Sequence, residues 1–197
     1  MKITALIILA GCCFITGIIH SQVNKRKKME KDTQYPKALV DYNDFKNLVS
    51  ELEKQREKNL VSLEVFLKMA KEENTVILDS RSDFRFNRKH LKGAIHLDFT
   101  DFTQENLLKL IPDANTRILI YCNNNFDGDP IDFASKMAKP KTKIETQILS
   151  NRKPIMLALN IPTHINLYGY GYKNIYELDE LVNVNDPRIQ FEGTEVK

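Results

Sequence analysis

The chain has 197 residues, of which 42% are hydrophobic, and its 29 basic and 26 acidic residues give a formal net charge of +3. This length supports one domain with its own core, rather than two independent domains. A nearly balanced charge without a basic face argues against a partner that is a nucleic acid, and the sequence contains no GxxxxGK[ST], HExxH or CxxC motif of the common nucleotide and zinc sites.

Residues 1–22, MKITALIILAGCCFITGIIHSQ, begin with one lysine, continue as an apolar run and end with small or polar residues. This pattern predicts a secretory signal peptide that is cleaved after Ser21, and therefore a location in the cell envelope, periplasmic or exported. Two alternatives remain. LAGC at 9–12 resembles a bacterial lipobox, which would make Cys12 the lipid-carrying residue of a lipoprotein. The basic block at 25–28 favours a retained membrane anchor, because cationic residues resist translocation.

Residues 23–60 are expected to form a polar tether followed by an extra helix ahead of the main domain. From about Asp41 to Lys58, apolar residues recur with the i, i+3, i+4, i+7 spacing of an amphipathic helix: Phe45, Leu48, Val49 and Leu52. The main domain is predicted at 61–182, and a polar tail follows at 183–197.

The main domain alternates between strand-like and helix-like segments. TVILD at 75–79 and RILIYC at 117–122 are continuous apolar runs, typical of strands that are covered on both faces of a parallel sheet. A shorter strand is expected at 93–99 and a final one at 164–171. Helices are expected at 61–74 with Ser62 as N-cap, 103–111 with Thr103 as N-cap, 152–161 and 174–182. The alternation predicts an α/β fold with a small, mostly parallel sheet flanked by helices.

Cys122 lies at the carboxyl end of a predicted strand, the edge at which parallel sheets gather their catalytic residues. Asn123, Asn124, Asn125, Phe126 and Asp127 follow it. Because asparagine tolerates left-handed backbone, the amides of 123–127 could converge on the sulfur and favour the thiolate over the thiol. The alternative is that Cys122 is a small buried apolar residue of the core.

The stretch VILDSRSDFRFNRKHLKGAIHLDF at 76–99 contains an Asp-x-Arg strand end and a His-x-x-Gly-Ala motif, and ILIYC and INLYGYGYKNIYEL follow in order. In these motifs the chain resembles the rhodanese-like family over about 61–182. The resemblance implies that Cys122 is the catalytic nucleophile. It would accept a sulfane sulfur from a small sulfur donor as a persulfide and pass it to a thiol or cyanide-like acceptor, without a metal or organic cofactor. Asp79 and Arg81 are expected to be structural residues near the site.

The segment after Cys122 departs from this family pattern. The loop carries no cation, and about thirty residues separate Cys122 from the next predicted helix, with an insertion at about 127–151 and a short helix at 133–137. A cation could return to the site from within or beside the insertion: Lys136, Lys139, Lys141, Lys143, Arg152 or Lys153.

Sulfur transfer has two alternatives. Position 128, six residues after the cysteine, holds Gly128 where cysteine phosphatases need an arginine, which argues against phosphatase activity. The second is a non-catalytic rhodanese-like module, in which the expanded loop binds a protein partner and Cys122 is inert or redox-responsive.

Overall fold

The computed structural model describes residues 35–138 and 155–196. The chain divides into two units at Tyr42, and all elements discussed below belong to the second unit. The predicted signal peptide, lipobox and anchor lie outside the described residues. Within the described ranges, none of the helices has the length and apolar character needed to cross a membrane.

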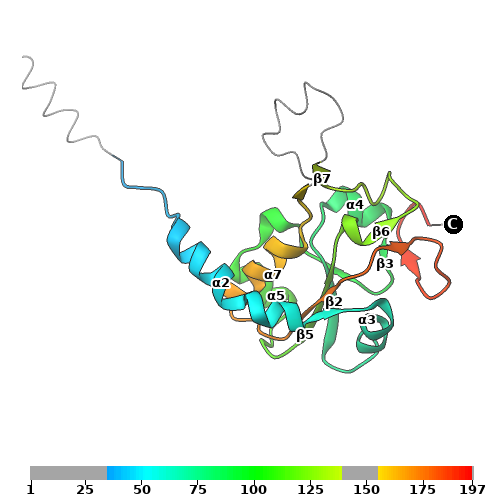
Figure 1. Cartoon of the computed structure of the whole chain (residues 1–197), viewed down its shortest axis with the longest axis horizontal. Coiled ribbons are helices and arrows are strands. Elements are labelled where there is room, and N and C mark those ends of the chain that lie inside the picture. The colour runs from blue at the N-terminus through cyan, green and yellow to red at the C-terminus, as the bar shows by residue number, and fades with distance from the viewer. Residues whose placement is uncertain (1–34, 139–154, 197) are drawn as a thin grey trace, which may run out of the picture. The chain divides into compact units, whose positions relative to one another are not determined.

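Five parallel strands form the central sheet (Figure 1). In spatial order they are β1 (Leu60–Val61), β9 (Ile175–Leu178), β5 (Arg117–Tyr121), β2 (Thr75–Asp79) and β4 (Ile95–His96). In the register of β2 and β5, Thr75 is paired with Arg117 and Asp79 with Tyr121, so both strands end at the same edge. The predicted parallel α/β sheet is confirmed.

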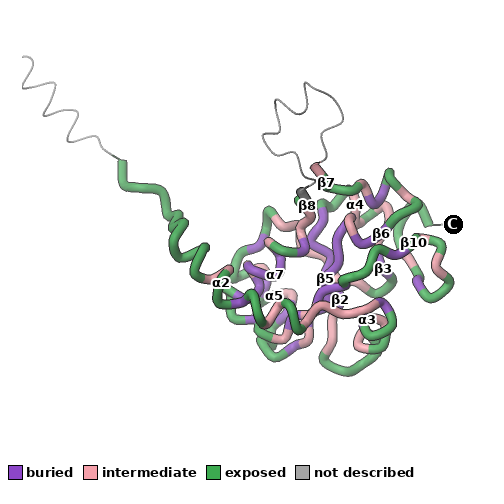
Figure 2. The backbone as a smooth tube through the Cα atoms, in the orientation of Figure 1, coloured by how far each residue is buried: buried purple, intermediate pink, exposed green. Residues whose placement is uncertain are grey.

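The sheet is covered on both faces because alternate side chains of each strand point to opposite sides. On one face, Leu78, Ile118, Ile120 and Ile175 pack in a common core with buried residues of three helices: α2 (Tyr42–Lys58), α5 (Gln104–Leu110) and α7 (Asn160–Gly169). On the other face, Ile77, Leu119, Tyr121 and Leu178 pack with α3 (Leu63–Met69) and C-terminal residues. Figure 2 shows the central strands as predominantly buried chain.

Two predicted helix starts are confirmed by their caps. The Ser62 hydroxyl accepts a hydrogen bond from the Val65 amide at 3.4 Å, and α3 begins at the next residue. The Thr103 hydroxyl accepts from the Asn106 amide at 3.2 Å at the start of α5. A short helix, α4 (Asp83–Arg88), and a 3₁₀ turn, η1 (Phe99–Asp101), follow β2 and β4 respectively.

The extra N-terminal helix is present as α2, and it is bound to the domain by both apolar and polar contacts. Leu52 is buried in the first core. Gln55 donates a hydrogen bond to the Lys173 carbonyl at 2.6 Å, and Asn59, just after the helix, donates to the Ile175 carbonyl at 2.8 Å. The apolar core joins α2 to α7, and the hydrogen bonds join its end to the α7–β9 connection and to β9, so the helix is an integral part of the domain.

Three element predictions in the last third of the chain are wrong. The described part of 152–161 contains a strand, β8 (Ile155–Met156), and only the start of α7. Most of 164–171, predicted as a strand, lies in α7. The expected helix at 174–182 is instead β9, a turn and the start of β10 (Val182–Asn183).

Burial explains these errors. Helix α7 buries side chains around much of its circumference, among them Thr163, His164, Ile165, Leu167 and Tyr168, so its sequence lacks the one-sided period of a surface helix. Strand β9 carries Glu177, which is only 4% exposed. In the sequence this carboxylate is typical of the solvent-exposed face of a helix. In the fold it faces Arg56 of α2.

Three small strand pairs lie outside the central sheet. β6 (Phe126–Asp127) pairs with β10, β3 (His90–Leu91) with β11 (Phe191–Glu192), and β7 (Met137–Ala138) with β8. The helix predicted at 133–137 is not formed, because Phe133 is buried against the rings of Phe126 and Phe191 and β7 begins at Met137. The remainder of the insertion lies outside the described residues.

Candidate functional site

The carboxyl edge of the sheet gathers the residues that follow β2, β5 and β9. Asp79 ends β2, Cys122 follows β5, and Leu178 ends β9. A single 3₁₀ turn, η2 (Asn123–Asn125), continues from Cys122. The start of α7 lies against this turn, because the Asn160 side chain donates a hydrogen bond to the Asn125 side-chain oxygen at 2.9 Å.

The sulfur of Cys122 is buried, with 0% of the residue exposed, and it accepts a hydrogen bond from the Leu159 amide at 3.3 Å. Leu159 is the residue that caps the start of α7. The first amides of a helix have no carbonyl partner within the helix, and they carry its positive dipole end. The amino end of α7 therefore supplies a donor to the thiol.

Burial raises the pKa of the Cys122 thiol above its ordinary value, while the amides of Leu159 and Asn123 and the charges of Lys136 and Arg81 lower it. The burial effect is the largest, so the pKa of the thiol is shifted upward, opposite to the direction expected from the sequence. Lys136 is one of the six cations proposed to return to the site. The other five lie outside the described residues.

The three asparagines do not adopt the left-handed backbone expected of them. They form the 3₁₀ turn, and Asn74 is the sole non-glycine residue of the described ranges with a positive φ. The Asn125 amide donates to the Cys122 carbonyl at 3.1 Å, and the Asn125 side-chain oxygen accepts from the Cys122 amide at 2.9 Å. The turn is thus closed on its own main chain.

The five predicted binding residues have different surroundings. The Asn123 amide acts on the sulfur, whereas the Phe126 amide donates to the Asn123 carbonyl. Phe126 is buried with aromatic neighbours, and Asp127 pairs with β10. Asn124 is directed to the insertion, since its side-chain oxygen accepts from the Lys136 amide at 2.7 Å. Of the predicted amides 123–127, that of Asn123 acts on the sulfur and that of Asn125 faces the Cys122 side chain. The Leu159 amide is a further donor from outside this segment.

Asp79 and Arg81 form a buried ion pair beside the turn. Arg81 is 2% exposed, and its guanidinium donates to both Asp79 oxygens at 2.6–3.0 Å. It also donates to the Lys89 carbonyl at 2.7 Å, the Asp132 carbonyl at 3.1 Å and the Asn123 side chain at 3.4 Å. These contacts tie the ends of β2 and β5 to the first part of the insertion, a structural arrangement.

Residues at the start of α7 were not predicted to belong to the site. Asn160 contacts Asn125, and the hydroxyls of Thr163 and Ser80 are hydrogen-bonded at 2.7 Å. One signal was available in the sequence. Pro162 is tolerated in the first turn of a helix, so NIPT marks a helix start near Asn160.

Comparison with known proteins establishes the family. A model of the rhodanese-like domain matches residues 62–180, which include the parallel sheet, Cys122 and α7. The chain belongs to the rhodanese-like domain family. Among curated proteins no significant match is found. Among solved structures, the chain is similar to the crystal structure of the BH2092 protein from Bacillus halodurans, with 13% sequence identity and a TM-score of 0.32. The match covers 66% of this chain and 72% of that one, and it is too distant to inform function.

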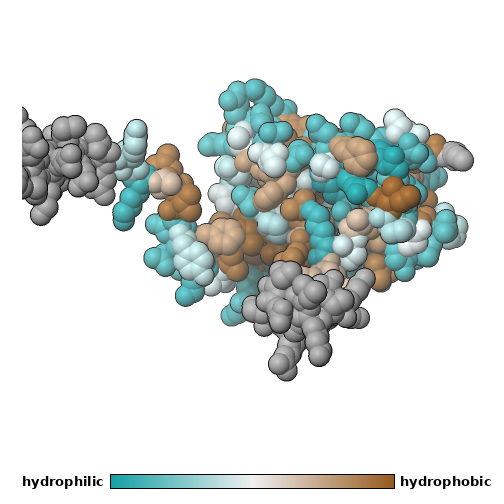
Figure 3. Space-filling model, turned by 90° about the horizontal axis from the view of Figure 1, so that it is seen from above, coloured by the Kyte–Doolittle hydropathy of each residue, from teal (hydrophilic) through white to brown (hydrophobic). Residues whose placement is uncertain are grey.

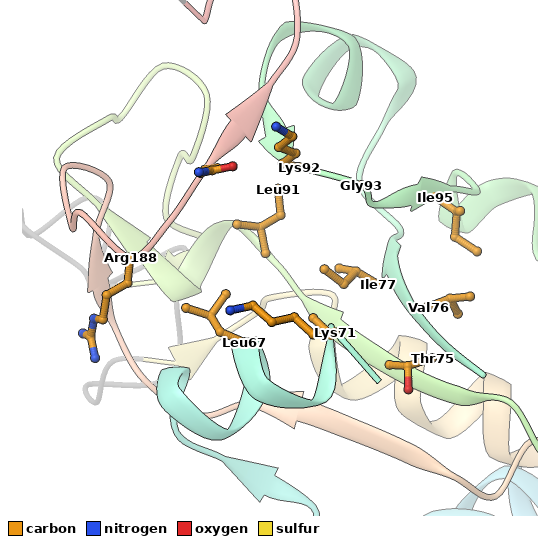
Figure 4. A pocket seen from close by; sticks show the side chains of 12 residues that line it. Leu67, Lys71, Thr75, Val76, Ile77, Leu91, Lys92, Gly93, Ile95 and Arg188 are labelled. Atoms are coloured by element: carbon orange, nitrogen blue, oxygen red, sulfur yellow. The ribbon is translucent and has the colours of Figure 1, made fainter. Parts of the chain in front are cut away.

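A cavity of this rhodanese-like domain lies away from Cys122. It has a volume of about 380 Å³ and opens between α3, the first residues of β2 and the segment 91–95 (Figure 4). Its walls include Leu67, Ile77 and Leu91. It contains no cysteine and meets β2 at Thr75–Ile77 rather than at the Asp79 end, so it is separate from the Cys122 site.

The described residues show no metal centre. Among them, no three His, Cys, Asp or Glu side chains are placed to hold an ion. His96, for example, is hydrogen-bonded to the Asp79 carbonyl at 2.9 Å and to Asp83 at 2.8 Å.

Lys136→Gln is expected to slow alkylation of Cys122 at pH 8 about two- to fourfold, because the Lys136 charge lowers the thiol pKa. The effect is expected at low salt, since dissolved ions screen this charge. The rate is measured by mass spectrometry of the peptide that contains Cys122. Lys109→Gln is the matched control, since Lys109 pairs with Glu105 on the exposed side of α5. Equal rates for the Lys136 variant and the unmodified chain would contradict the assignment.

Proposed function

We propose that this rhodanese-like domain is a sulfurtransferase that carries a sulfane sulfur on Cys122 as a persulfide. The sulfur would come from a small donor such as thiosulfate and pass to a thiol or cyanide-like acceptor. The observation that supports this proposal is the hydrogen bond from the Leu159 amide to the Cys122 sulfur at 3.3 Å, at the sheet edge of a rhodanese-like fold. Such a donor stabilises negative charge on sulfur.

The chemistry requires two exchange steps at sulfur. In the first, the Cys122 thiolate attacks the sulfane sulfur of the donor, the donor's S–S bond breaks, and thiosulfate would leave as sulfite. In the second, the acceptor attacks the outer sulfur, the persulfide S–S bond breaks, and the Cys122 thiolate is restored. The two steps balance without an external oxidant, reductant or cofactor.

The raised pKa of Cys122 is compatible with this scheme. Burial keeps the resting sulfur as a thiol, and only the thiolate attacks. Two amides and two cations already lower the pKa at this atom. They would favour the anion that forms in each step, so deprotonation of the thiol is expected to limit the rate of the first step at neutral pH.

A second candidate is a non-catalytic module with a protein partner. It is favoured by the complete burial of Cys122 and by the apolar side chains that are exposed in the segments between η2 and α7. These are Ile131, Met137, Met156 and Leu157, with Ile161 in the first turn of α7. Hydrophobic areas do lie between hydrophilic ones on the face shown in Figure 3. Such side chains suit a partner surface.

An assay with thiosulfate and cyanide separates the two candidates. The sulfurtransferase proposal expects thiocyanate formation by the full-length chain and loss of that activity in Cys122→Ser, with an unchanged unfolding transition. The absence of thiocyanate from the folded, unmodified chain would instead favour the partner-binding module. Cys12 and Cys13 remain present in both proteins and act as an internal control for other thiols.

A further inference from the structure

Arg56 of α2 forms a bidentate ion pair with Glu177 of β9. Its Nε and Nη2 atoms each donate to one carboxylate oxygen at 2.8 Å. The Glu177 side chain is 6% exposed and that of Arg56 is 23% exposed, so the pair lies largely inside the domain. Arg56 precedes the residues 62–180 that match the family, and it is therefore an addition to the rhodanese-like domain.

Glu177 is surrounded by groups from three elements. Arg56 faces it from α2, while Asn160 and His164 face it from α7, the His164 Nδ1 atom at 3.8 Å. Asp179 acts on it from the end of β9. Burial raises the pKa of Glu177, Arg56 and Asn160 lower it, and Asp179 raises it. Burial also lowers the pKa of His164 to about 4, which leaves Arg56 as the counter-charge for this carboxylate.

Asn160 connects Glu177 to the cysteine. Its side chain lies near enough to Glu177 to lower the pKa of that carboxylate. It also donates to the Asn125 side-chain oxygen, the same oxygen that accepts from the Cys122 amide. Asn160 also follows directly on Leu159, whose amide donates to the Cys122 sulfur. A displacement of Asn160 would therefore disturb both the main chain of Cys122 and the donor to its sulfur.

We propose that Arg56 is a positioning residue of the Cys122 site. By keeping Glu177 ionised, it fixes Asn160 and with it the Leu159 amide that faces the sulfur. Without Arg56, the buried Glu177 carboxylate would lose its cation and its pKa would rise further. Its contacts with the α7 side chains would then rearrange, toward the unpartnered Asn160 Oδ1 or His164 Nδ1 atom wherever it takes up a proton. Helix α2 would thus set the reactivity of the cysteine. This inference deepens the proposed function and rests on it for its biological meaning.

The test is the pH dependence of Cys122 alkylation in the full-length chain, followed by mass spectrometry of the peptide that contains Cys122. Arg56→Met and Glu177→Gln are expected to lower the rate at pH 8 about three- to tenfold, with little change in the limiting rate at high pH, because a weaker Leu159 contact raises the thiol pKa. Arg56→Lys keeps the charge and is expected to lie close to the unmodified chain.

Arg117→Met is the matched control. Arg117 pairs with Glu72 at the amino end of β5, far along the strand from Cys122. It is expected to lower stability while leaving the alkylation profile unchanged. The proposal is overturned if Arg56→Met has the profile of the unmodified chain, or if Arg117→Met shifts it equally. If Arg56→Met does not fold, Glu177→Gln alone tests the proposal. An alkylation profile of Glu177→Gln equal to that of the unmodified chain then overturns it.

The readout is independent of sulfur transfer. Alkylation reports on the thiol, whereas the thiosulfate and cyanide assay reports on the reaction. A shifted profile in a chain that forms no thiocyanate would retain the role of Arg56 and reject the sulfurtransferase. An unshifted profile in an active chain would reject the role of Arg56 alone.

Discussion

Arg81→Met is expected to lower the free energy of unfolding by about 3–5 kcal/mol, because it leaves the Asp79 carboxylate buried without its cation. Asp79 is 0% exposed. In the variant its remaining hydrogen-bond donors would be the Tyr121 hydroxyl and the main-chain amide of residue 81, neither of which carries a positive charge. The Lys89 and Asp132 carbonyls and the Asn123 side chain would also lose a donor. Removal of one member of a buried pair is among the most damaging single changes.

Urea denaturation of the full-length chain measures this effect. Arg188→Met is the matched control, because Arg188 forms a similar pair with Asp186 but its side chain is 57% exposed, and its loss is expected to leave the stability nearly unchanged. Equal stability of the Arg81 variant and the control would show that the Asp79–Arg81 pair does not anchor the strand ends. Double substitution with Asp79→Asn should recover part of the loss, since it removes the unpaired charge.

The alkylation rate of Cys122 is expected to fall about 100-fold between pH 8 and pH 6 and to be still rising at pH 9. A thiol reacts as the thiolate, so its rate rises about tenfold per pH unit until the pKa is reached. Burial raises the pKa of Cys122, which moves this plateau to higher pH than for an ordinary cysteine. The peptide that contains Cys122 is followed by mass spectrometry across the pH range.

A cysteine that is ionised at rest would behave differently in this experiment. Its alkylation rate would be nearly constant from pH 8 to pH 6, because the thiolate would persist at the lower pH. That outcome would show that the Leu159 and Asn123 amides outweigh the burial of the sulfur. The unfolded chain, measured in denaturant, provides the ordinary cysteine profile for comparison.

The first half of the fold follows from local sequence patterns. The strands β2 and β5 are continuous apolar runs. Ser62 and Thr103 are the N-caps of the helices that begin at the next residue, as predicted. Each of these signals involves only a few neighbouring residues, and in the fold those residues adopt the structure that the signal predicts. The position of Cys122 at a strand end follows from the same reasoning.

The second half of the fold depends on contacts that local sequence patterns do not report. Strand β9 carries a buried carboxylate, Glu177, whose partner Arg56 lies 121 residues earlier in the chain. The environment of the sulfur depends on Leu159, 37 residues after Cys122. The asparagines form a 3₁₀ turn in place of the expected left-handed backbone, although the Asn123 amide is still one of the donors to the sulfur. Tertiary packing overrides local propensity at each of these positions.

The persulfide itself is the most direct test of the account. The full-length chain is incubated with thiosulfate, freed of excess donor, and digested without reductant, and the mass of the peptide that contains Cys122 is determined. The sulfurtransferase account predicts a gain of one sulfur atom on that peptide, which disappears on addition of cyanide and is absent from Cys122→Ser. The account would be contradicted if the peptide of the folded chain stayed unmodified at all donor concentrations although alkylation shows that the Cys122 thiol is free to react.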